Sequence, residues 1–224
     1  MRIGILQCGH FPGYETSGID VDRSFYRLLQ GQGLWFQTWS VIDMDFPKID
    51  AADGWLLTGS PHGAYEDLPF IPPLEDFIRQ AAEAKTPMVG ICFGHQIIAQ
   101  ALGGRVEKFS GGWAVGRHVY ESKEGEALAL NAWHQDQVVA LPPGAEVIAK
   151  SEFCTNAALA YGDRILTYQP HPEHGVAEVA ELLKRRGPDL PEALREGAAA
   201  GQSQPVDSQA IADRIGAFFR DAKG

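Results

Sequence analysis

Hydrophobic residues in the first hundred positions alternate between short continuous runs and stretches with helical spacing. Short apolar or β-branched runs bounded by glycine, proline or acidic residues are typical of buried strands, and apolar residues at i, i+3, i+4 and i+7 are typical of amphipathic helices. The predicted strands are at residues 2–8, 34–41, 54–58 and 87–91. The predicted helices between them are at residues 22–32, 73–84 and 95–102. Strands that alternate with helices in this way indicate a parallel sheet covered on both faces.

The pattern changes after Gly103 and Gly104, where the hydrophobic runs become shorter. These runs predict hairpins and returning strands at residues 115–121, 146–151, 157–161 and 164–168. Two further helices are predicted at 176–186 and 208–222, with a loop of small and polar residues at 197–205 between them. No internal repeat or linker divides the sequence, so we expect residues 1–224 to form a single domain whose C-terminal helices occupy about 175–224.

The composition narrows the classes of partner. With 19 Lys and Arg against 29 Asp and Glu, the formal net charge is −10, which argues against binding to nucleic acid or to an anionic membrane surface. Three widely spaced cysteines, Cys8, Cys92 and Cys154, do not form a disulfide framework or a zinc motif. The first apolar run meets glycine and proline too early for a signal peptide, so we expect a cytoplasmic protein.

The stretch around Cys92 carries the strongest chemical signal. A predicted buried strand ends at this cysteine and a helix follows directly, with Gly90 and Gly94 on either side. Glycines at these positions permit a tight strand-to-helix turn that exposes a nucleophile above the sheet. The helix N-terminus would favour the thiolate form of the cysteine, and the backbone N–H of Phe93 could donate to a developing oxyanion. A buried, inert cysteine is the alternative that this short motif leaves open.

A base for such a nucleophile is found after a later strand, in the sequence Q-P-H-P-E-H. His171 and Glu173 are two residues apart in a proline-stiffened segment, so their side chains point to the same side and Glu173 can orient the imidazole. The segment follows a predicted parallel strand, and open parallel sheets carry their sites at the carboxyl ends of their strands. We therefore expect His171 to lie near Cys92.

The two motifs together, G-I-C-F-G-H-Q and Q-P-H-P-E-H, resemble those of the class I glutamine amidotransferases. The resemblance covers residues 1 to about 174, roughly three quarters of the chain. It implies a flavodoxin-like three-layer α/β/α sandwich with a mostly parallel central sheet. It also implies a thiol enzyme that cleaves a γ-glutamyl amide, with Cys92 as nucleophile, His171 as base and Glu173 as its orienter, and with no cofactor or metal.

Further positions are assigned by the same resemblance. The loop that completes the oxyanion hole corresponds to Gly59 and Ser60, and Ser60 stands where the family usually has glycine. Gln96 corresponds to a residue that helps to bind glutamine, and the loop with Gly112 and Trp113 corresponds to backbone that holds the amino-acid end of the substrate. The H-x-D-x-V stretch that begins at His134 is interpreted as structural support near the site.

The substrate expected from the resemblance is glutamine or another γ-glutamyl compound, and three interpretations of the whole chain stay open. The chain could be a glutaminase subunit that supplies ammonia to a synthase partner. It could be a free-standing γ-glutamyl peptidase or hydrolase that acts on peptides or amines. It could also be a catalytically silent regulatory or binding subunit, against which the intact Cys, His and Glu argue.

Other chemically interesting residues are expected to be structural. His62, His95 and His174 with nearby acidic residues lack the spacing of a known metal motif. The basic run at 184–186 ends a predicted helix and is interpreted as a solvated terminus. Three tryptophans on predicted strands, Trp35, Trp39 and Trp55, are expected in the core, and Cys8 and Cys154 are expected to be buried bystanders.

Overall fold

A nine-stranded sheet forms the centre of the computed structural model, which describes residues 1–11, 13 and 20–222. The strands, in their order across the sheet, are β2 (Trp35–Trp39), β1 (Arg2–Leu6), β3 (Gly54–Leu57), β4 (Met88–Ile91), β11 (Ile165–Tyr168), β10 (Ala158–Tyr161), β9 (Ala145–Lys150), β6 (Ala114–Ser122) and β7 (Ala127–His134). A separate two-stranded sheet pairs β5 (Arg105–Lys108) with β8 (Asp136–Ala140).

The sheet has a parallel half and an antiparallel half. Strands β2, β1, β3, β4 and β11 pair in parallel, so their carboxyl ends meet at one edge. The pairs from β11 through β10, β9 and β6 to β7 are antiparallel. The predicted α/β fold with parallel strands in its centre is therefore confirmed, and the predicted nucleophile and base follow two neighbouring parallel strands.

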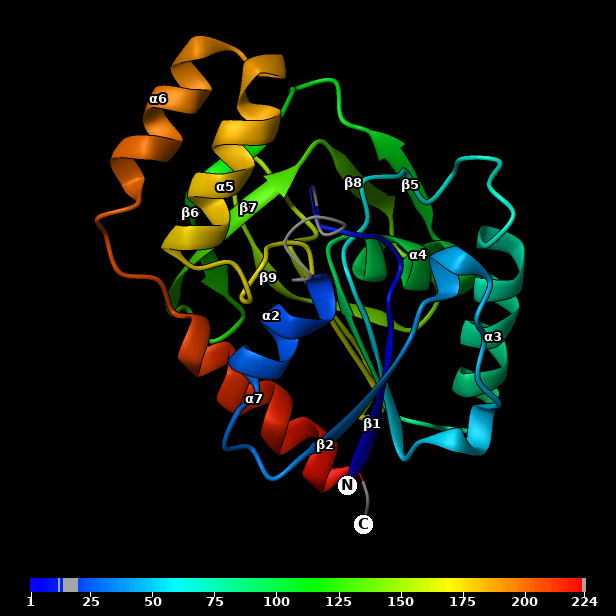
Figure 1. The fold of residues 1–224 in the computed structure, drawn as a ribbon. Coiled ribbons are helices and arrows are strands. Elements are labelled where there is room, and N and C mark those ends of the chain that lie inside the picture. The colour runs from blue at the N-terminus through cyan, green and yellow to red at the C-terminus, as the bar shows by residue number, and fades with distance from the viewer. Residues whose placement is uncertain (12, 14–19, 223–224) are drawn as a thin grey trace.

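Helices cover both faces of the parallel half (Figure 1). Helices α3 (Ile71–Glu83) and α4 (Phe93–Ala101) lie on one face, and α2 (Val21–Leu28) and α7 (Ser208–Asp221) lie on the other. Helices α5 (Val176–Arg186) and α6 (Glu192–Gly201) lie beside the antiparallel end of the sheet, where α6 contacts β6. Single-turn helices occur at Val41–Asp43, Ile49–Ala51 and Gly187–Asp189.

The alternation of side chains along the buried strands produces two apolar cores. On β3, Trp55 and Leu57 point into the core beneath α3 and α4, whereas Leu56 points into the core beneath α2 and α7. Helix α3 contributes Leu74 and Ile78 to the first core at the helical spacing that the sequence predicted. Strands buried on both faces have no polar side, which is why the sequence shows continuous apolar runs there.

The sequence-based prediction was wrong for several elements outside the parallel half. Residues 197–201 belong to α6, because an alanine-rich stretch forms helix readily although its small residues resemble a loop. Strands β5, β7 and β8 were not predicted, since their polar and apolar residues follow no clear period. Trp35, predicted to be buried, is 77% exposed because β2 is the edge strand of the sheet.

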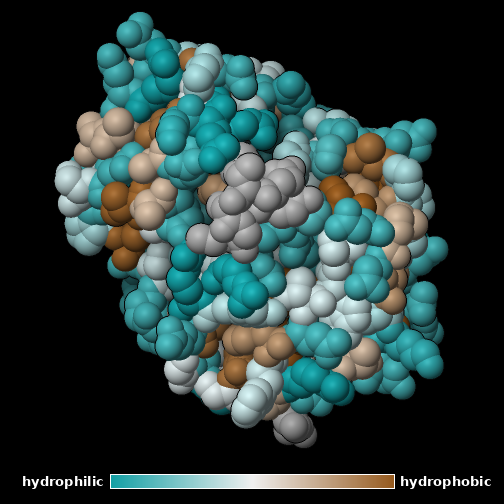
Figure 2. Space-filling view, viewed as in Figure 1, coloured by the Kyte–Doolittle hydropathy of each residue, from teal (hydrophilic) through white to brown (hydrophobic). Residues whose placement is uncertain are grey.

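The face of the molecule that Figure 2 presents is mainly hydrophilic. Figure 2 shows hydrophobic residues in small separate groups over the face that it presents, without one extended apolar patch. The large exposed hydrophobic side chains, Trp35 and Val176 among them, are on different elements. Within the described ranges, no helix combines the length and the apolar character that a membrane crossing requires.

Candidate active site

Cys92 occupies a strained turn between β4 and α4. Its backbone has φ 54° and ψ −104°, a region that non-glycine residues rarely adopt and that costs about 1–3 kcal/mol. The turn is held from the neighbouring strand, because the Cys92 N–H donates to the carbonyl of Tyr168 at 2.8 Å. A strained backbone that neighbouring strands hold in place is the geometry expected for a nucleophile at the end of a strand.

The two flanking glycines are required by close packing at this turn. A Cβ added to Gly90 would lie 2.5 Å from the carbonyl oxygen of Gly94. A Cβ added to Gly94 would lie 2.3 Å from the carbonyl oxygen of Leu57 on the adjacent strand. Both distances are too short for any other residue, so the glycine spacing around Cys92 has a steric cause.

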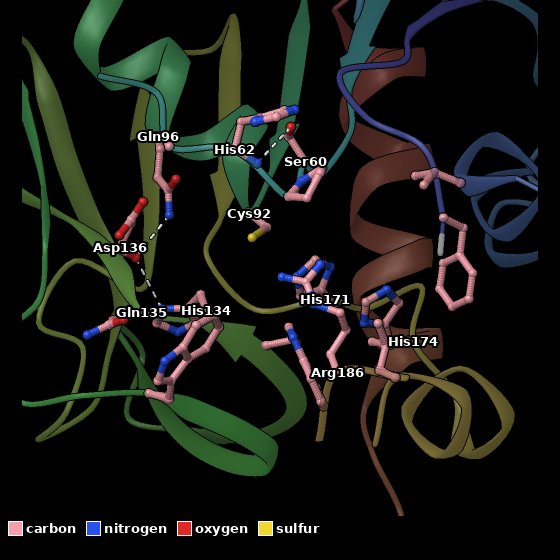
Figure 3. A pocket seen from close by; sticks show the side chains of 18 of the residues that line it. Ser60, His62, Cys92, Gln96, His134, Gln135, Asp136, His171, His174 and Arg186 are labelled. Carbon is pink, nitrogen blue, oxygen red and sulfur yellow. Dashed lines mark hydrogen bonds between the residues drawn. The ribbon is translucent and has the colours of Figure 1, made fainter. Parts of the chain in front are cut away.

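His171 follows β11, the neighbour of β4, and is fixed from two sides. Its backbone N–H donates to the carbonyl of Asn131 at 2.8 Å, and its Nδ1 lies 2.7 Å from Oε1 of Glu173. Because a carboxylate accepts, this contact places the proton of the imidazole on Nδ1 and leaves Nε2 to face other groups. Both side chains are buried, and Figure 3 shows His171 beside Cys92.

The surroundings of His171 and Glu173 favour the charged form of each side chain. Burial disfavours the charged imidazolium, but the neighbouring Cys92 and Glu173 outweigh it and raise the pKa of His171 well above 6.5. Burial also opposes ionisation of Glu173, but His171 and His174 lower its pKa below the ordinary 4.5. A protonated His171 beside an ionised Glu173 is therefore the favoured state of this pair.

His174 packs against the imidazole of His171. The two rings are stacked, with centroids 4.0 Å apart and an interplanar angle of 5°, and Nε2 of His174 lies 3.7 Å from Oε1 of Glu173. Burial, together with the charge of His171, lowers the pKa of His174 to about 3. A neutral ring in this position packs against the imidazolium without repelling it.

A cavity of about 510 Å³ opens above these residues. Its wall contains the predicted residues Gly59, Ser60, Cys92, Gln96, Trp113, His171 and Glu173. Two predicted residues are not part of the wall. The side chain of Phe93 is buried in the core at the first turn of α4, and Gly112 precedes the lining residue Trp113 in the chain.

Gln96 and the H-x-D-x-V stretch meet on one side of Cys92 (Figure 3). The side-chain amide of Gln96 donates to the carbonyl of Asp136 at 2.9 Å and to Oε1 of Gln169 at 3.1 Å. Nδ1 of His134 lies 3.2 Å from the same carbonyl, and burial lowers the pKa of His134 to about 3. These hydrogen bonds are therefore made by neutral groups, namely the amide of Gln96, the imidazole of His134 and the backbone carbonyl of Asp136.

The cavity also contains residues that the sequence interpretation had not placed there. The expectation that the basic run 184–186 is wholly solvated was wrong for Arg186, which is half-buried and lines the cavity. A signal was present in the helical period, since Val179, Leu182 and Arg186 follow one another at i, i+3 and i+7 on the buried face of α5. Lys108 and Trp133, on strands that were not predicted, also line the cavity.

One group of side chains in the described ranges has the donor spacing of a metal site. Ligand atoms of His171, Glu173 and His174 lie within 4.8 Å of one another. Nδ1 of His171 is already engaged with Glu173, so a metal ion there would displace the proton that fixes the imidazole. The arrangement fits a hydrogen-bonded pair better than a metal centre.

The family model and similar curated proteins agree with one another. The profile described as "Glutamine amidotransferase class-I" matches residues 19–186. Gamma-glutamyl peptidase 3 of Arabidopsis thaliana is 32% identical over 171 residues, which cover 69% of each chain. A GMP synthase of Thermomicrobium roseum is 36% identical over 154 residues, which cover 66% of this chain and 27% of that protein.

The architecture agrees with the sequence comparison. The crystal structure of a glutamine amidotransferase from Methylobacillus flagellatus superposes with a TM-score of 0.77 at 24% identity, covering 99% of this chain and 94% of the other. That likeness shows a shared fold, with the same sheet and flanking helices. Since the family profile spans most of the sequence as well, the chain belongs to the class I glutamine amidotransferases.

Proposed function

We propose that the protein is a thiol hydrolase that cleaves γ-glutamyl amides through a Cys92–His171–Glu173 triad. The observation that carries this proposal is the meeting of a strained, strand-end cysteine with a buried histidine whose Nδ1 is 2.7 Å from a carboxylate. Nucleophile, base and orienter in this order are the minimum for covalent acyl transfer.

In the first half of the reaction, Nε2 of His171 holds the proton taken from Cys92, and the thiolate attacks the γ-glutamyl carbonyl carbon. The carbonyl oxygen becomes an oxyanion, which the backbone N–H groups of Phe93 and Ser60 would stabilise. The first N–H groups of a helix have no partner within the helix, so that of Phe93 is free for this task. Collapse breaks the C–N bond, and His171 returns the proton to the departing amine.

In the second half, water attacks the γ-glutamyl thioester. His171, now neutral, accepts a proton from the water, and the thiolate of Cys92 leaves as the C–S bond breaks. Glutamate is released and the protonated His171 again faces the Cys92 sulfur. Glu173 holds the imidazole in one orientation throughout, and its negative charge stabilises the imidazolium in both halves.

Two fates of the departing amine are compatible with membership of this family. The share of each relative's length that aligns with this chain favours one of them. The aligned region makes up 69% of the γ-glutamyl peptidase but only 27% of the GMP synthase. We therefore prefer a free-standing γ-glutamyl peptidase as the more specific function, with ammonia supply to a synthase partner as the second candidate. We further propose that residues 1–224 act as one domain and that the free thiol works in a reducing compartment such as the cytoplasm.

The direct test is to incubate the purified chain with glutamine and with a set of γ-glutamyl dipeptides and to measure glutamate release. We expect release that depends on Cys92, with dipeptides preferred over glutamine. A Cys92→Ala variant that is folded but inactive is the control. Equal release by both proteins would contradict the proposed nucleophile.

A further inference from the structure

The cavity contains one arginine with no ionic partner among the described residues. Arg186 is half-buried at the end of α5, lines the cavity, and forms neither an ion pair nor a side-chain hydrogen bond with any described residue. Its neighbours in sequence differ: Lys184 is 76% exposed, and Arg185 pairs with Glu181 one turn earlier. A half-buried guanidinium that points into a cavity and has no described anionic partner can bind a negatively charged ligand.

The acidic side chains that line the cavity within the described part of the chain are already engaged. Glu173 contacts His171 at 2.7 Å, and Asp136 accepts from the hydroxyl of Tyr65 at 3.1 Å. Glu66 accepts from the backbone N–H of Gly63 at 2.7 Å and faces His62 at 3.4 Å. None of these carboxylates lies within ion-pair distance of Arg186, so no described acidic side chain of the cavity competes with a ligand for its charge.

The position of Arg186 indicates which part of a substrate it meets. Figure 3 shows Arg186 on the side of His171 and His174, whereas Gln96 and Asp136 lie across Cys92. In the proposed reaction His171 gives its proton to the departing nitrogen, so the leaving group must lie on the side of His171. The γ-glutamyl part then extends toward Gln96.

We propose that Arg186 determines substrate specificity by binding the carboxylate of the leaving amino acid. This inference rests on the proposed function and makes it more specific: the substrates are γ-glutamyl amino acids or peptides whose leaving residue carries a free carboxylate. The planar guanidinium matches a carboxylate through two parallel hydrogen bonds. Glutamine, whose leaving group is ammonia, has no group for this contact.

The size of the cavity agrees with a two-part substrate. Its volume of about 510 Å³ falls in the range of about 300–1,000 Å³ that accommodates drug-sized ligands, which are larger than glutamine. Leu182, on the same face of α5 as Arg186, supplies an apolar surface beside the guanidinium. The leaving residue would contact this apolar surface through its side chain and Arg186 through its carboxylate.

The experiment compares γ-glutamylalanine, its C-terminal amide and glutamine with wild-type protein, Arg186→Gln and the matched control Lys184→Gln. We expect the wild type to prefer the free acid over the amide by about 10- to 100-fold in kcat/KM, the range of one charge-assisted hydrogen-bond contact. Arg186→Gln should reduce that preference to near unity by slowing only the free acid. Lys184→Gln, which removes a cation from the solvent side of the same helix, should keep the preference.

Two results would overturn the inference. If Arg186→Gln slows the acid, the amide and glutamine equally, Arg186 binds the carboxylate of the glutamyl part instead. If the preference survives in Arg186→Gln, the arginine does not contact the leaving group. Calorimetric binding of the acid and the amide to Cys92→Ala, with and without Arg186→Gln, makes the same comparison without turnover, so absence of glutamate release in the wild type would count against the proposed reaction alone.

Discussion

Two strands of the parallel half lead into cysteines at the same edge of the sheet, and the two thiols are in contrasting environments. Cys8 comes two residues after β1, and Cys92 comes directly after β4. Thr58 lies between them: its hydroxyl accepts from the N–H of Cys8 at 3.0 Å, and its carbonyl accepts from the N–H of Gly94 at 3.1 Å. Location at a strand end is therefore common to both residues.

The surroundings of the two sulfur atoms differ. Cys8 is fully buried, its thiol donates to the carbonyl of Leu6 at 3.3 Å, and burial raises its pKa to about 12. Cys92 stands in a strained turn at the start of a helix, on the wall of a cavity, next to a histidine that a carboxylate orients. The comparison teaches that the turn and the base, rather than the strand end, distinguish a nucleophile from a core residue.

The comparison is tested most severely by removing each thiol. Cys92→Ala should lower γ-glutamyl cleavage by at least about 10⁴-fold, because loss of a covalent nucleophile leaves only binding and oxyanion stabilisation. Cys8→Ala should keep kcat within a few-fold of wild type. Steady-state glutamate release from both folded variants gives the answer, and a larger loss in Cys8→Ala would reverse the assignment.

Chemical labelling extends the comparison to all three cysteines. Burial raises the pKa of both Cys8 and Cys154 to about 12, so near neutral pH both thiols stay protonated and unreactive. A brief treatment with iodoacetamide should therefore modify Cys92 first by a wide margin. Peptide mapping by mass spectrometry measures this order. Preferential labelling of Cys8 or Cys154 would show that the turn does not activate Cys92.

Within the triad, the base and its orienter should differ in effect. His171→Ala removes the proton carrier and should lower kcat by about 10²- to 10⁴-fold. Glu173→Gln removes one charge-assisted hydrogen bond, so its loss should be smaller, about 10- to 100-fold. Both variants need assay under one set of conditions, with folding verified by circular dichroism. Equal losses would mean that Glu173 takes part more directly.

The pH profile sharpens the same distinction. Because the pKa of His171 is raised well above 6.5, the protonated form that donates to the leaving amine persists above neutrality, and the alkaline limb of kcat/KM should lie well above pH 6.5. Glu173→Gln removes one of the negative charges that raise this pKa, so the limb should move to lower pH. An unchanged alkaline limb in Glu173→Gln would show that it does not report His171.

The smallest effect expected concerns stability. Cys8→Ala removes a fully buried sulfur from the core and should lower the free energy of unfolding by about 1 kcal/mol. Cys92→Ala should cost less, because its side chain lines the cavity at the edge of the core, where the sulfur is not enclosed on all sides. Urea unfolding of both variants compares the two values, and a larger loss for Cys92→Ala would contradict the idea that the turn serves function.

The sequence predicted the region around Cys92 better than the rest because two local rules act there together. Continuous apolar runs identify strands buried on both faces, and the steric contacts of Gly90 and Gly94 leave a recognisable spacing around the turn. The exposure of Trp35 and the position of β5 depend on the order and pairing of strands, which local periodicity does not encode.

The sequence also predicted part of the candidate site. His171 and Glu173 lie two residues apart, so their contact could be inferred from chain geometry. Arg186 enters the cavity only because α5 is turned with Val179 and Leu182 toward the core, an orientation set by tertiary packing. The stacked ring of His174 likewise depends on the turn that follows β11, for which the sequence offered no signal.

The most direct test of the account is to trap the covalent intermediate. Rapid acid quench of the protein during turnover of a γ-glutamyl dipeptide, followed by intact-mass and peptide mass spectrometry, should show one γ-glutamyl group attached to the peptide that contains Cys92. The adduct should be absent from Cys92→Ala and should disappear once substrate is consumed. Steady glutamate release with no adduct under any quench condition, or an adduct on Cys8, would contradict the assignment of Cys92 as the nucleophile.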